Sequence, residues 1–68
     1  MDKKEFVKRW KKELKMKNGW PVYIELNDGS VLHITRFVFS RDFSGHIKLF
    51  LDNLWIGHIP ISSIKEVF

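Results

Sequence analysis

The spacing of apolar residues changes once along the chain, at Pro21, and this change limits the possible folds more than any other feature. Before Pro21, Phe6, Trp10 and Leu14 follow the spacing of one side of a helix. After it, apolar and polar residues alternate with the period of two expected of half-buried strands. The sequence therefore predicts one N-terminal helix followed by a β structure.

The helix is predicted over residues 2–17. Asp2 is a suitable N-cap, and Glu5 follows three positions later, as in a capping box. Asn18 and Gly19 favour a stop, because both residue types adopt the left-handed conformation of a helix C-cap.

Five strands are predicted after the helix, at about residues 22–26, 31–39, 46–51, 54–59 and 64–68. Turn residues separate them, and one turn of 3₁₀ helix is expected at 61–63. In the long second strand, alternation places Leu32, Ile34 and Val38 on one side. The opposite side of that strand then holds His33, Thr35, Phe37 and Phe39.

With 68 residues, the chain is long enough for one domain only. We therefore expect a single domain over 1–68, with a basic amphipathic helix at 1–18 and a β-barrel at 20–68. Five short antiparallel strands favour a small, strongly bent SH3-like barrel, because closure hides the strand edges. The long second strand is expected to bend and serve both halves of this mostly β fold.

The order of elements resembles that of the Sm-like family, which includes the Sm/LSm proteins and the bacterial RNA chaperone Hfq. The resemblance is carried by the helix up to Asn18, by the strand and turn at Val22–Gly29 and by the ending His58–Val67. The match is partial, because the Asp and Asn of the Sm RNA-binding loop lack clear counterparts and the Tyr-Lys-His triplet of Hfq is reduced to His58. The resemblance implies an RNA-binding protein that forms rings.

Positive charge is concentrated in the helix. The net charge is +4, yet residues 1–18 carry eight basic and three acidic side chains, while residues 19–68 carry four basic and five acidic ones. Clustered basic residues neutralise phosphates and release counterions, so the pattern indicates a polyanionic partner. The candidate phosphate contacts are Lys4, Lys8, Arg9, Lys11, Lys12 and Lys15. The competing interpretation is a solvated helix that keeps a small protein soluble.

Aromatic and basic residues also share the side of the strands opposite the aliphatic core. Tyr23, Phe37, Lys48 and Trp55 are the candidates for stacking on bases and contacting phosphates. The alternative is that several of these rings pack under the helix or in a subunit interface.

The sequence favours a binding protein over an enzyme. It holds no cysteine, no nucleophile motif and no glycine-rich phosphate loop. His33, His46 and His58 lack the spacing of a metal site, so we expect no metal and no cofactor. We do not expect a small-molecule ligand, because a barrel of this size has little depth for a pocket. The main hypothesis is binding of RNA or another single-stranded nucleic acid.

Two other functions stay open. One is an SH3-like adaptor that binds an acidic or extended peptide, and the other is a module that binds an anionic membrane surface through the basic helix. We expect a cytoplasmic protein, because no stretch is long and apolar enough for a signal peptide or a membrane span. The apolar segments 54–56 and 64–68 predict a homo-oligomer formed through strand edges.

Overall fold

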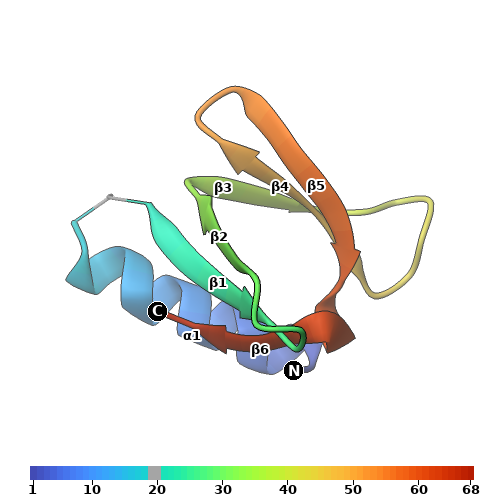
Figure 1. The fold of residues 1–68 in the computed structure, drawn as a ribbon, viewed down its shortest axis with the longest axis horizontal. Coiled ribbons are helices and arrows are strands. Elements are labelled where there is room, and N and C mark those ends of the chain that lie inside the picture. The colour runs from blue at the N-terminus through green and yellow to red at the C-terminus, as the bar shows by residue number, and fades with distance from the viewer. Residues whose placement is uncertain (19–20) are drawn as a thin grey trace.

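A computed structural model describes residues 1–18 and 21–68 of the chain, and Gly19 of the predicted helix stop lies outside them. One helix is followed by six strands in two antiparallel three-stranded sheets (Figure 1). The elements are α1 (Lys3–Met16), β1 (Val22–Leu26), β2 (Val31–Ile34), β3 (Arg36–Phe39), β4 (His46–Leu51), β5 (Leu54–Pro60), a 3₁₀ turn (Ile61–Ser63) and β6 (Ile64–Val67). The first sheet has the order β2-β1-β6 and the second the order β3-β4-β5.

Helix α1 begins and ends where the local sequence predicts. The Asp2 carboxylate accepts a hydrogen bond from the backbone N–H of Glu5 at 2.8 Å and so satisfies one free donor of the first turn. At the other end, Asn18 has a φ of 53°, in the left-handed region that terminates helices.

The first sheet is built around a tight turn between β1 and β2. Gly29 has a φ of 90°, a conformation that glycine adopts without strain. The Asp28 carboxylate accepts a hydrogen bond from the backbone N–H of Ser30 at 2.8 Å. Hydrogen bonds from the backbone and the hydroxyl of Ser30 hold the pKa of Asp28 below its usual range. The predicted turn at 27–30 is therefore confirmed.

The predicted second strand is divided in two at Thr35. The Thr35 N–H donates to the carbonyl of Phe50 at 2.8 Å, and its Oγ1 accepts from the N–H of Asp52 at 2.6 Å. These bonds hold the chain where it leaves the first sheet and enters the second. The alternation changes phase here, so Ile34 is buried while Val38, predicted on the same side, is exposed.

Strand β4 is the centre of the second sheet and carries the buried Ile47 and Leu49. Its hairpin with β5 turns at Asp52, which has a φ of 54°, and the ladder shifts register between Leu49 and Phe50. The predicted turn at 52–53 and the 3₁₀ turn at 61–63 are both present.

The core lies between the two sheets and α1, which runs beside β6 and β1 (Figure 1). Both sheets and the helix contribute to one cluster of buried residues: Phe6, Trp10, Val22, Ile24, Ile34, Ile47, Leu49, Ile61, Ile64 and Val67. The two sheets do not close into the predicted barrel. β2 and β3 have four residues each, too few for either strand to pair in both sheets, and the helix shields the core instead.

Candidate nucleic-acid interface

Five lysines form one continuous stripe on the outer side of α1. They are Lys4, Lys8, Lys11, Lys12 and Lys15, which we call the lysine stripe. Residues spaced by three or four lie on the same side of a helix, and the stripe runs about 16 Å along the axis. All five side chains are exposed. Within residues 1–18 and 21–68, no carboxylate forms an ion pair with any of them.

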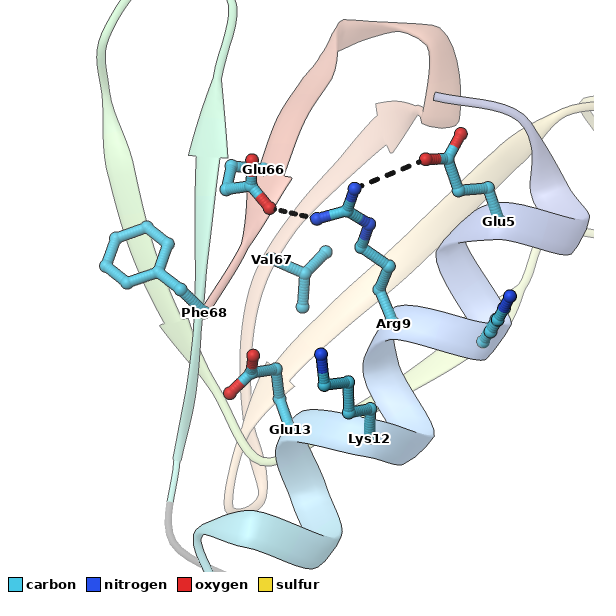
Figure 2. A pocket seen from close by; sticks show the side chains of 8 residues that line it. Glu5, Arg9, Lys12, Glu13, Glu66, Val67 and Phe68 are labelled. Carbon is cyan, nitrogen blue, oxygen red and sulfur yellow. Dashed lines mark hydrogen bonds and ion pairs between the residues drawn. The ribbon is translucent and has the colours of Figure 1, made fainter.

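Arg9, predicted as a sixth phosphate contact, points elsewhere. Its guanidinium pairs with the carboxylate of Glu66 on β6 and lies 3.5 Å from that of Glu5 (Figure 2). Two carboxylates therefore offset the Arg9 charge, and the residue belongs to the contact between α1 and β6. Sequence spacing did not reveal this pairing, because Glu66 is 57 positions away in the chain.

A shallow groove lies beside this contact, between α1 and β6 (Figure 2). It is lined by three acidic and three basic side chains together with Val67 and Phe68: Glu5, Glu13, Glu66, Lys8, Arg9 and Lys12. Its charges balance, so the groove itself does not attract a polyanion. Lys8 and Lys12 belong both to the lining of the groove and to the lysine stripe.

Phe37 lies inside the molecule, under the helix. Its ring is 4.8 Å from that of Phe6 and 5.0 Å from that of Trp10, both in edge-to-face geometry. Such contacts stabilise aromatic pairs beyond the burial of their area. Phe37 therefore packs under the helix, as the alternative to base stacking predicted. The reason is the change in the phase of alternation at Thr35.

Tyr23 lies on the outer side of the first sheet, where side chains of this protein already pack against its ring. Its ring contacts His33 at 4.3 Å and stacks on Phe68 at 5.5 Å. The Lys17 ammonium lies 4.6 Å from the ring centre, within cation–π range. These neighbours leave Tyr23 half-buried and limit the ring surface that a base can reach.

Lys48 and Trp55 lie together on the outer side of the second sheet. Trp55 pairs across the ladder with Phe50, which pairs in turn with Arg36. Lys48 lies in the next row, between Val38 and His58. Arg36 and His58 were absent from the predicted site, because the change of phase at Thr35 and the register shift between Leu49 and Phe50 place them on this side, and simple alternation shows neither.

Two histidines meet at one end of this sheet. The rings of His46 and His58 are 5.4 Å apart, and the ring of Phe43 lies against both. Across the described residues, no group of three His, Cys, Asp or Glu side chains is placed to hold a metal ion. In the same part of the chain, no helix has the length and apolar character needed to cross a membrane.

No family model, curated protein or solved structure matches this chain. The resemblance to the Sm-like family therefore stays a prediction.

Proposed function

We propose that this protein binds nucleic acid, with RNA as the favoured ligand, and that the lysine stripe contacts its phosphates. One observation carries the proposal: five exposed lysines on one side of α1 form no ion pair with a carboxylate in the described structure, while Glu5 is paired with Arg9. Uncompensated positive charge of this kind attracts a phosphate backbone and is weakened by salt.

The size of the effect follows from counterion release. Each phosphate of a single strand that a lysine neutralises contributes about −0.7 to the slope of the logarithm of the binding constant against the logarithm of the salt concentration. Five contacts predict a slope of about −3.5. In the second part of the proposal, bases stack on exposed rings, of which Trp55 is the most accessible of the three predicted ones.

The burial of the apolar side of α1 favours nucleic acid over a membrane surface. A membrane-binding helix inserts its apolar side chains into the headgroup region. Here Phe6 is fully buried and Trp10 is 7% exposed, so the helix would have to leave the core before it inserted. A phosphate backbone needs only the lysines, which are already exposed.

The element order also supports an RNA-binding protein. A helix, short antiparallel strands and a 3₁₀ turn before the last strand form the order on which the resemblance to the Sm-like family rests. The proposal also includes a relationship to the small SH3-like β-barrel proteins. It further includes association between copies of this chain through strand edges. β5 and β6 are each paired on one side only.

Charge reversal tests the proposal. The variant with Lys8, Lys11, Lys12 and Lys15 changed to Glu is expected to lose RNA binding, at least a 100-fold fall, because attraction becomes repulsion. Anisotropy of a labelled single-stranded RNA measures binding, and circular dichroism checks that the fold is kept. The Lys65→Glu variant is the control, since Lys65 is an exposed lysine on β6 outside the stripe. Unchanged binding in the four-residue variant would refute the assignment of the phosphate contacts.

A further inference from the structure

The outer side of the second sheet combines rings with positive charge in a regular array. Its first row is Arg36, Phe50 and Trp55, and its second row is Val38, Lys48 and His58. Neighbouring strands are about 4.8 Å apart, and rows on one side repeat about every 6.7 Å. We call these six residues the stacking face.

The first row is open to a flat ligand. Trp55 is 59% exposed, which is unusual for so large an apolar side chain. The Arg36 guanidinium lies 4.1 Å from the centre of the Phe50 ring. A guanidinium held over a ring leaves its own second surface free, and unpaired bases stack on guanidinium planes as well as on aromatic rings.

The charge of the stacking face fits a phosphate backbone. β3, β4 and β5 contain no acidic residue, while Arg36 and Lys48 supply two positive charges. Asp42 and Asp52, the carboxylates closest in the chain, lie in the connecting loops. A protein partner of the same face would have to be acidic, whereas a polynucleotide supplies both the negative charge and the flat rings.

A buried polar atom provides a separate observation. Within the described residues, the Nε2 atom of His58 is buried and has no hydrogen-bond partner. The ring of Phe43, which is 56% exposed, lies against His58 from the loop between β3 and β4. Because protein atoms cover this nitrogen, it is not itself a contact for a ligand, and the exposed ring of Phe43 is the surface that a base can reach at this end of the sheet.

We infer that the stacking face binds unpaired bases and makes this protein selective for single-stranded over double-stranded nucleic acid. The inference rests on the proposed function and assigns it a ligand class and new residues. Bases within a duplex are stacked on one another and cannot lie on Trp55, while those of a single strand are free to do so. A three-stranded face of this size holds about two or three bases, as comparable stacking sheets do.

The test compares two RNA probes and three variants. The probes are a single-stranded oligouridine of about 12 nucleotides and a GC-rich RNA duplex of the same length. The variants are Trp55→Ala, Trp55→Phe, which keeps an aromatic ring, and Leu54→Ser. The last is the control, because Leu54 is 65% exposed beside Trp55 and offers no ring.

Wild-type protein is expected to bind oligouridine more tightly than the duplex. Trp55→Ala is expected to weaken oligouridine binding about tenfold, since one base–aromatic stack is lost, and to leave duplex binding unchanged. Trp55→Phe is expected to restore most of the affinity, and Leu54→Ser to bind both probes as the wild type does. An equal loss for both probes, or no loss for either, would overturn the inference.

Two further outcomes separate this inference from its alternatives. If the wild type binds neither probe, the proposed function fails as well. If it binds both probes equally through the lysine stripe, only the inference fails. Sedimentation of the same variants tests the alternative that the stacking face binds a second copy of this chain. A wild-type dimer that Trp55→Ala dissociates, with oligouridine binding unchanged, would make the stacking face an interface between copies and overturn the inference.

Discussion

The two sides of helix α1 differ in what they contact and in what they contribute. The inner side places Phe6 and Trp10 in the core against Phe37. The outer side carries the lysine stripe, whose five side chains are exposed. Between them, Arg9 pairs with Glu66 on β6. One helix thus contributes to stability on one side and offers a charged surface on the other.

The comparison shows that the two contributions are separable by mutation. Hydrophobic stabilisation depends on buried area, while attraction to phosphates depends on exposed charge. Changes on the inner side should therefore alter the free energy of unfolding, and changes on the outer side should alter binding.

The largest expected effect is on the inner side. Phe6→Ala is expected to lower the free energy of unfolding by about 3–5 kcal/mol, because a fully buried ring is removed. A domain of this length has about 3–10 kcal/mol in total, so the variant is expected to be largely unfolded at 37 °C. Urea denaturation followed by circular dichroism measures the change. Met16→Ala, at a position 69% exposed on the same helix, is expected to stay within about 0.5 kcal/mol of wild type. A Phe6→Ala protein as stable as wild type would show that α1 is not part of the core.

A smaller effect sharpens the contrast between the lysine stripe and the paired arginine. Lys11→Gln and Arg9→Gln each remove one positive charge from an exposed position of α1. Lys11→Gln is expected to reduce the salt slope of RNA binding by about 0.7, since one phosphate contact is lost. Arg9→Gln is expected to leave the slope unchanged, because Glu5 and Glu66 already offset the charge. Fluorescence anisotropy titrations measure both slopes. An equal change of the salt slope in both variants would contradict the distinction between the lysine stripe and Arg9.

The smallest expected effect lies far from both sides of the helix, at the turn of the first sheet. Because its pKa is lower in the folded state, ionised Asp28 stabilises the fold at neutral pH, and this contribution is lost as pH falls below 3.8. Asp28→Asn keeps the turn geometry but does not titrate, so its stability should fall less steeply in acid than that of wild type. Urea denaturation at several pH values measures both proteins. A steeper acid loss in the variant would contradict the sign of the shift, and RNA binding at neutral pH is expected to be unaffected.

Local signals were sufficient for most elements of the fold. The Asp2 cap, the turn at Gly29 and the 3₁₀ turn before β6 each depend on residues close together in the chain. The division at Thr35 was not predicted, because it depends on bonds to Phe50 and Asp52, which are distant in sequence. The missed division reversed the expected directions of Phe37 and Val38 and suggested a barrel where two open sheets occur.

The candidate site shows the same limit. The lysine stripe was predictable, because helical spacing alone places its members on one side. The engagement of Arg9 by Glu66 and the row formed by Arg36, Phe50 and Trp55 depend on tertiary pairing. Alternation in the second sheet reveals that row only once the phase after Thr35 is known.

The salt dependence of binding to single-stranded RNA tests the central claim most directly. Anisotropy titrations of a labelled oligouridine at increasing salt concentration are expected to give a slope of about −3.5 for wild type. The variant with Lys8, Lys11, Lys12 and Lys15 changed to Gln is expected to give about −0.7. A wild-type slope near zero, or the same slope in both proteins, would contradict the assignment of the lysine stripe as the phosphate-binding surface.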